Sequence, residues 1–205
     1  YGGIQLRTDK LAVNSFDSSN TQVIVQTDAV LRDPSAWYHC VVSVNGTAGT
    51  IKFYINGTEQ AQTVTNGSLA SSRSWDFLSH DSRRTFDIGD SSGSQAPDAY
   101  LAEFHYIDGQ AYDASYFGET KDGVWIPKSY SGSHGNNGFY LPFTNAASSG
   151  ASSFFSDSGN SYVEFSNATH YDIGSSDDFT IECFFNMTAT GLADFSYFLG
   201  KYQSS

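Results

Sequence analysis

The residues of this sequence that could do chemistry are a few glutamates and histidines spread along the chain. Hydrolysis of a glycosidic bond needs two carboxyl groups held close together, one as a general acid and the other as a nucleophile or base. Glu103, Glu164 and Glu182 fall in segments that are typical of β-strands, but none has an acidic residue two or four positions further on. Residues at those spacings share one face of a strand. The sequence therefore predicts that the protein is not an enzyme.

Nucleophilic catalysis and metal binding find no support in the spacing of serine, histidine and cysteine. Ser133 and His134 are adjacent, but neighbouring side chains in a strand or loop point apart, and no Gly-x-Ser-x-Gly turn occurs. There is no Cys-x-x-Cys motif, and the histidines lack the clustered spacing of metal ligands. The histidines are His39, His80, His105, His134 and His170. We expect His39 and His105, which fall in predicted strands, to be packed or solvent-facing.

Two kinds of ligand remain open, the first of which is calcium. Aspartate oxygens are hard ligands suited to Ca²⁺, and the candidates are Asp87, Asp90, Asp177 and Asp178. No EF-hand loop is present, so the sequence assigns no metal site.

The second kind of ligand is carbohydrate, which usually requires an exposed aromatic ring beside polar groups. Trp75, between Ser74 and Asp76 in a long loop, is the candidate ligand-binding residue. The alternative is that its indole packs on the body of the domain, as loop aromatics often do. Trp37, in a core-strand pattern, and Trp125, in an apolar segment, are predicted to be structural.

The composition indicates an all-β protein with a sizeable core. Of the 205 residues, 39% are hydrophobic and 16% aromatic, and 19 are glycine, which suits many short strands joined by tight turns. The net charge of −12 argues against nucleic acid, whose phosphates require clustered Lys and Arg. No apolar run approaches the roughly 20 residues of a membrane span, so no membrane insertion is predicted.

Alternating segments predict the strands themselves. They are Gly3–Arg7, Leu11–Phe16, Thr21–Gln26, Trp37–Val44, Ile51–Ile55, Glu59–Thr65, Arg84–Ile88 and Tyr100–Ile107. Asn56-Gly57 predicts a type I′ hairpin, whose two central residues need positive φ. Cys40 and Cys183 alternate in phase with apolar neighbours, so we expect buried free thiols, with a disulfide across the core as the less favoured alternative.

The order of these segments predicts an unusual domain organisation. Residues 161–205 have the pattern of the opening strands of a sandwich, and residues 1–107 have the pattern of its later strands. Residues 108–160 form an extension and linker between them, and Asp113 could cap a short helical turn in it. Either 161–205 completes the sandwich of 1–107, or it starts a second repeat in a tandem array, or it exchanges with a neighbouring chain.

Three stretches carry a resemblance to the laminin-G-like, concanavalin A-like jelly-roll domains. They are Phe179-Thr-Ile-Glu-Cys-Phe-Phe, then Trp37-Tyr-His-Cys-Val-Val with Ile51-Lys-Phe-Tyr-Ile-Asn-Gly, and Asp98-Ala-Tyr-Leu-Ala-Glu-Phe. The segment from Phe117-Gly-Glu-Thr to Gly138-Phe-Tyr-Leu-Pro-Phe resembles the extension that follows this sandwich in structural proteins of tailed phages, marine ones especially. The resemblance implies an antiparallel jelly-roll β-sandwich.

The same resemblance implies a non-enzymatic structural or adhesive module of a virion, such as a tail fibre or a capsid-surface protein. Its partners would be copies of itself, neighbouring repeats or other virion proteins, with host-surface glycan as a further candidate. The alternative is an extracellular, lectin-like carbohydrate-binding domain of a secreted or cell-surface protein.

Overall fold

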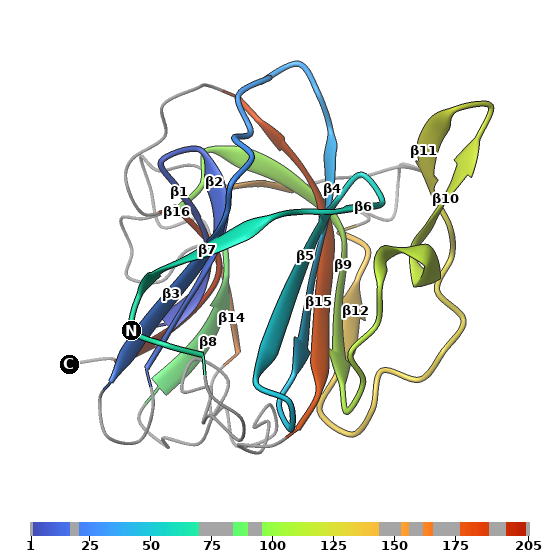
Figure 1. Cartoon of the computed structure of the whole chain (residues 1–205). Helices are drawn as coiled ribbons and strands as arrows, with labels where there is room; N and C mark the ends of the chain where they lie inside the picture. Colours follow the sequence, from blue (N-terminus) through green and yellow to red (C-terminus); the bar gives the residue numbers. More distant parts are fainter. Residues whose placement is uncertain are drawn as a thin grey trace.

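The structure, a computed structural model, describes residues 2–16, 21–69, 84–89, 96–143, 153–155, 162–165, 177–188 and 196–203. Two antiparallel sheets pack face to face, and a short hairpin lies beyond one of them (Figure 1). We call the sheet at the left of Figure 1 the back sheet and the sheet in the middle the front sheet. This is the predicted all-β jelly-roll sandwich.

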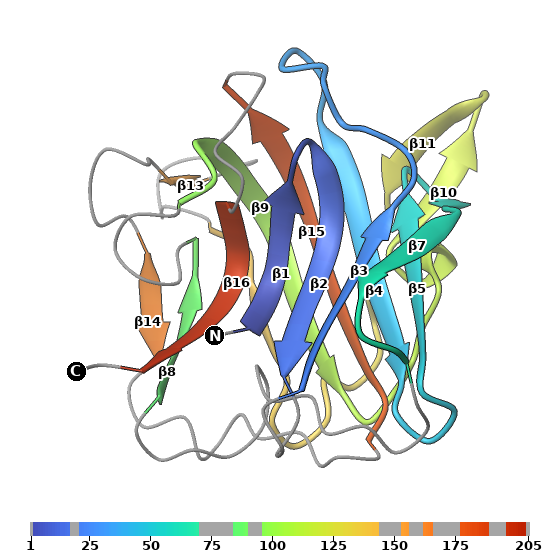
Figure 2. The same cartoon turned by 60° about the vertical axis from the view of Figure 1, so that its left-hand side comes forward.

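The back sheet has the strand order β14-β8-β16-β1-β2-β3-β7. Its strands are β1 (Gly2–Arg7), β2 (Lys10–Phe16), β3 (Gln22–Thr27), β7 (Gln62–Asn66), β8 (Arg84–Ile88), β14 (Val163–Phe165) and β16 (Ser196–Gln203). Figure 2 shows β16, β1 and β2 side by side at the centre of this sheet.

The front sheet has the order β12-β9-β15-β4-β5-β6, and β13 also pairs with β9. Its strands are β4 (Tyr38–Asn45), β5 (Thr50–Ile55), β6 (Thr58–Glu59), β9 (Ala99–Asp108), β12 (Phe139–Leu141), β13 (Ser153–Phe155) and β15 (Phe179–Met187). Between β5 and β6, Asn56 and Gly57 both have positive φ, at 48° and 80°. The predicted Asn-Gly hairpin is therefore confirmed.

Strands from the end of the chain are interior strands of both sheets. In the front sheet β15 lies between β9 and β4, with Ile181 opposite both Tyr106 and Val42. In the back sheet β16 lies between β8 and β1, with Leu199 opposite both Ile88 and Ile4. Without β15 and β16 each sheet would be split and would expose two strand edges. Whether this chain also belongs to a tandem array stays a prediction.

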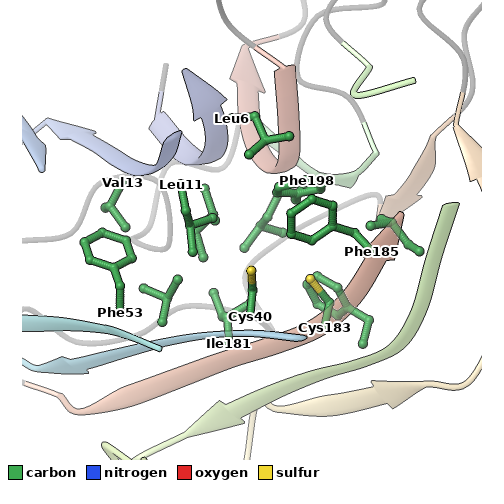
Figure 3. Close-up of a cluster of buried hydrophobic side chains, with 14 of the residues drawn as sticks. Leu6, Leu11, Val13, Cys40, Phe53, Ile181, Cys183, Phe185 and Phe198 are labelled. Atoms are coloured by element: carbon green, nitrogen blue, oxygen red, sulfur yellow. The ribbon is translucent and has the colours of Figure 1, made fainter. Parts of the chain in front are cut away.

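The core lies between the two sheets and is built from their inward-facing side chains. Figure 3 shows Leu6, Leu11, Val13 and Phe198 of the back sheet meeting Cys40, Phe53, Ile181, Cys183 and Phe185 of the front sheet. Burying one such apolar side chain contributes roughly 1.5–3 kcal/mol, so the contacts between the sheets dominate the stability of the sandwich. Cys40 and Cys183 are opposite each other on β4 and β15, and both are buried free thiols, as predicted.

A β-bulge in β9 corrects one part of the predicted pattern. Simple alternation along the predicted strand Tyr100–Ile107 would put Glu103 on the core side together with Leu101, but Glu103 has a φ of 52° and the register between β15 and β9 shifts beside it. Beyond this extra residue the core positions are Phe104 and Tyr106. A bulge reverses the phase of the strand, so Glu103 leaves the core and joins the outer face of the front sheet.

Candidate functional site

The segment that follows β9 forms a third layer against the outer face of the front sheet. It contains the short 3₁₀ helix η1 (Ala114–Tyr116) and the hairpin of β10 (Gly118–Lys121) and β11 (Val124–Pro127), at the right of Figure 1. We call residues 108–143 the extension. As expected, Asp113 caps η1, because its carboxylate accepts a hydrogen bond from the Ser115 N–H at 2.8 Å.

A second apolar cluster joins the extension to the front sheet. Val41, Tyr54 and Ile107 of the sheet pack with Ala114 and Phe117 of the extension, all at most 8% exposed. The partly buried residues that pack against this cluster are Tyr112, Trp125 and Tyr130. The extension therefore covers an outward sheet face that alternation alone would leave in water.

Trp125 forms a polar link between the hairpin of the extension and the sheet. Its indole N–H donates to His39 Nδ1 at 2.9 Å, and its ring packs against the backbone at Gly57 and Gly118. This confirms the structural role predicted for Trp125. His39 is fully buried, and burial lowers its pKa to about 4, so its ring is neutral near pH 7.

Beside His39 lies a buried carboxyl group, Glu182, which is 1% exposed. His39 Nε2 is 3.0 Å from Glu182 Oε1, but the two atoms do not have the geometry of a hydrogen bond. Burial, and secondarily the charge of Glu103, raise the pKa of Glu182 well above its usual value. The group is therefore held in its neutral, protonated form at mildly acidic pH.

Two further histidines meet next to Glu182. His105 Nδ1 and His134 Nε2 are 3.0 Å apart, and their rings are stacked. The ring of Tyr140 also stacks with that of His105, with the ring centroids 4.2 Å apart. Burial, and secondarily the charges of His134 and His39, lower the pKa of His105 to about 3. His134 is thus engaged with His105, and the Ser133 side chain accepts from the Gly135 N–H, so no serine–histidine catalytic pair forms.

The structure brings together two of the three glutamates, which the spacing within single strands did not predict. Glu103 and Glu182 lie on neighbouring strands and both line a small cleft of about 260 Å³ under Lys128 and Ser129. Alternation within one strand could not find this pair, because the two residues come from different strands. Glu182 is nevertheless covered, and Glu103 is held by the Tyr140 hydroxyl at 2.5 Å, so the pair does not present two accessible carboxyl groups to a substrate.

Another cleft, with a volume of about 500 Å³, lies on the extension itself. We call it the tyrosine cleft, and its lining residues are Tyr112, Asp113, Ser115, Tyr116, Lys128, Ser129, Tyr130, Ser131 and Gly132. The rings of Tyr112 and Tyr116 stack with centroids 4.0 Å apart, and Tyr116 is 45% exposed. Burial, and secondarily a hydrogen bond with Tyr112, raise the pKa of Tyr130 to about 12, so its hydroxyl keeps its proton at physiological pH.

The tyrosine cleft contains charged groups that are already hydrogen-bonded and hydroxyl groups that are not. Asp113 accepts from both the backbone N–H and the hydroxyl of Ser115, and the Lys128 ammonium donates to the Ser115 carbonyl. Among the residues that the structure describes, the hydroxyls of Tyr116, Ser129 and Ser131 have no hydrogen-bond partner. The cleft therefore offers aromatic rings and hydroxyls to a ligand, while its two charged groups already have hydrogen-bond partners in Ser115.

A second cleft, of about 360 Å³, shares Asp113 with the tyrosine cleft. We call it the strand cleft because outward residues of β4 and β5 form most of it. Its lining residues are Ser43, Asn45, Ala48, Thr50, Lys52, Tyr54, Ala111 and Asp113. The Lys52 ammonium is paired with Glu59 at 3.1 Å.

The residues singled out in the sequence fare differently. Trp75 and Asp90 lie outside the described residues, so the prediction of a ligand-binding role for Trp75 stays a prediction. Trp37 was predicted to be structural, but it precedes β4 on the outward phase of that strand and is 45% exposed, so this prediction is wrong. Asp178 accepts from the Asn45 side chain and the Gly46 N–H. Within the described part of the chain no group of three His, Cys, Asp or Glu residues is placed to hold a metal ion.

Sequence reasoning missed the tyrosine cleft. Tyr112 precedes the cap of η1 and Tyr116 is its last residue, so the rings stack across a turn too short and irregular for a helical spacing rule to predict. Tyr130 comes from a separate segment, and nothing in the sequence places it beside them.

In the described ranges no helix is long and apolar enough to cross a membrane.

Comparison with protein families agrees with this architecture. A laminin G family model, described as the concanavalin A-like lectin/glucanases superfamily, matches residues 3–110, which is more than half of the chain. The chain belongs to this superfamily. The match ends at the start of the segment that carries the tyrosine cleft. No curated protein and no solved structure matches the chain.

Proposed function

We propose that this protein is a non-catalytic adhesive module that binds carbohydrate in the tyrosine cleft. The observation that carries the proposal is the stacked pair of Tyr112 and Tyr116 beside hydroxyls that have no partner of their own among the described residues. Sugar rings have apolar faces that stack on aromatic side chains and hydroxyls that exchange hydrogen bonds with polar groups. The volume of about 500 Å³ lies within the usual range for small-molecule sites, roughly 300–1,000 Å³.

A binding role fits the chemistry of the site better than hydrolysis does. The superfamily includes both lectins and glucanases, so membership alone does not decide between them. In the tyrosine cleft the described lining contains a single carboxylate, Asp113, which is occupied as the cap of η1. A glycosidase needs two carboxyl groups on either side of the scissile bond.

The proposal is tested by binding to a glycan array, followed by titration calorimetry with the glycans that bind. Tyr116→Ala should weaken binding roughly tenfold, because it removes a stacking ring worth about 0.5–1.5 kcal/mol together with its apolar contact area. Val124→Ala is the matched control, since Val124 is an exposed side chain of the same extension and does not line the cleft. Equal binding by both variants would contradict the proposed site, and release of reducing sugar from the bound glycan would contradict the non-catalytic role.

A structural role in a virion is the second candidate. The observation that favours it is the extension, whose sequence resembles the one that follows this sandwich in structural proteins of tailed phages, and which packs here as an integral layer of the domain. In this role the domain would contact copies of itself or other virion proteins and would reside in the particle. Light scattering and electron microscopy of the purified chain test it. A regular oligomer supports the virion role, and a monomer at high concentration contradicts it.

A further inference from the structure

We infer that the ligand of this protein is a neutral oligosaccharide chain, which occupies the tyrosine cleft and the strand cleft together. The inference rests on the proposed function and adds the class of ligand: an extended, uncharged chain rather than a single terminal sugar.

The first argument is the continuity of the two clefts. Asp113 borders both, and Tyr112 of the tyrosine cleft is next in the chain to Ala111 of the strand cleft. Asp113 also acts electrostatically on Lys52, in the strand cleft, which places the two linings close to each other. The volumes of about 500 and 360 Å³ are each within the range of a small-molecule site. A ligand that filled only one of them would leave the other empty beside it.

The second argument is the balance of charge along the two clefts. Lys52 is paired with Glu59, and Lys128 and Asp113 are both held by Ser115. The two cations and two anions cancel in sum, so neither an acidic nor a basic ligand would be attracted by a net countercharge. This favours a neutral glycan over a charged one.

The third argument is that hydroxyl groups line both the strand cleft and the tyrosine cleft. In the strand cleft the hydroxyls of Ser43 and Thr50 have no hydrogen-bond partner within the described ranges. They correspond to the free hydroxyls of Tyr116, Ser129 and Ser131 in the tyrosine cleft. A hydroxyl can both donate and accept, which matches the hydroxyl groups of successive neutral sugars.

The experiment is a titration of the intact chain with neutral gluco-, manno- and galacto-oligosaccharides of one to six sugars, followed by calorimetry. For at least one series the affinity should rise tenfold or more between one and four sugars. Ala111→Trp, which fills the strand cleft with a bulky ring, should abolish that rise while leaving the affinity for the shortest ligand within about twofold. Val124→Trp is the matched control, because it adds the same bulky ring at an exposed position of the extension that lines neither cleft, and it should behave as the unmodified chain does. Thermal unfolding of all variants establishes that they are folded.

The outcomes separate this inference from the proposed function. If short sugars bind in a Tyr116-dependent manner but length brings no gain, the proposed function stands and the two-cleft inference is wrong. The inference is equally overturned if the gain persists in a folded Ala111→Trp. If no oligosaccharide of any length binds, the proposed function and the inference both fail. Stronger binding of sulfated or carboxylated oligosaccharides than of neutral ones would contradict the charge argument.

Discussion

Replacing Trp125 with phenylalanine tests the attachment of the extension to the front sheet. The substitution keeps an aromatic ring against the backbone at Gly57 and Gly118 but removes the indole N–H that donates to His39 Nδ1 at 2.9 Å. Because His39 is fully buried, its acceptor nitrogen would then lack a partner inside the protein. Leaving a buried polar atom unsatisfied costs about 1–3 kcal/mol, and we expect the free energy of unfolding to fall by that amount.

Trp125→Ala should cost more, because it also removes the packing of the ring. Truncating a fully buried tryptophan costs roughly 3–5 kcal/mol, and Trp125 is only partly buried, so its packing loss should be below that range. The assay is urea unfolding followed by circular dichroism, with a fall in Tm of about 2–4 °C per kcal/mol as the thermal counterpart.

The control for both variants is Val124→Ala. Val124 precedes Trp125 on β11 and is 62% exposed, so its truncation should change the free energy of unfolding by less than about 0.5 kcal/mol. If Trp125→Phe costs no more than Val124→Ala, then the indole–imidazole hydrogen bond does not hold the extension and the reasoning is wrong.

Two further predictions concern the buried polar layer and the packing under Trp125. The folded-state pKa values of His39 and His105, about 4 and about 3, lie below the unfolded value of 6.5. Their contribution to the free energy of unfolding is therefore complete above pH 6.5 and is lost as the pH falls towards 4. The raised pKa of Glu182 acts in the opposite direction, because the folded protein then holds a proton that the unfolded chain has released. Glu182→Gln should therefore steepen the loss of stability between pH 7 and pH 4.5, measured by urea titrations at each pH. An unchanged dependence of stability on pH would refute this. Gly118→Ala should lower the free energy of unfolding by about 1–3 kcal/mol, because the new Cβ would lie 2.4 Å from the Trp125 ring. Gly123→Asn is its control, as nothing lies within 4 Å of that position and asparagine tolerates positive φ, so equal costs would refute the packing argument.

The sandwich could be predicted from the sequence because its signals are local. Alternation placed Cys40 and Cys183 on the core side, and the Asn56-Gly57 pair located a hairpin, since only a few residues accept the positive φ of that turn. The cap at Asp113 was found for the same reason, because a cap depends on residues two positions away. Each of these features is fixed by neighbours in the chain.

The site could not be predicted because it depends on layers that distant segments build. Alternation correctly turns Glu182 away from the core, but it cannot say that the extension covers that face and removes the residue from water. The bulge at Glu103 reverses the phase of β9 in the middle of a strand whose sequence continues to alternate. The tyrosine cleft requires Tyr116 and Ser129, which are thirteen positions apart in the chain, to line the same cavity.

The most direct test of the central claim is to follow the tyrosine ring signals of the chain by NMR during titration with a glycan that binds. The account predicts that signals of Tyr112, Tyr116 and Tyr130 shift together and saturate, while that of Tyr162, an exposed tyrosine of the back-sheet region, stays in place, and that the glycan is recovered intact. Shifts confined to other tyrosines, or cleavage of the glycan during the titration, would contradict it.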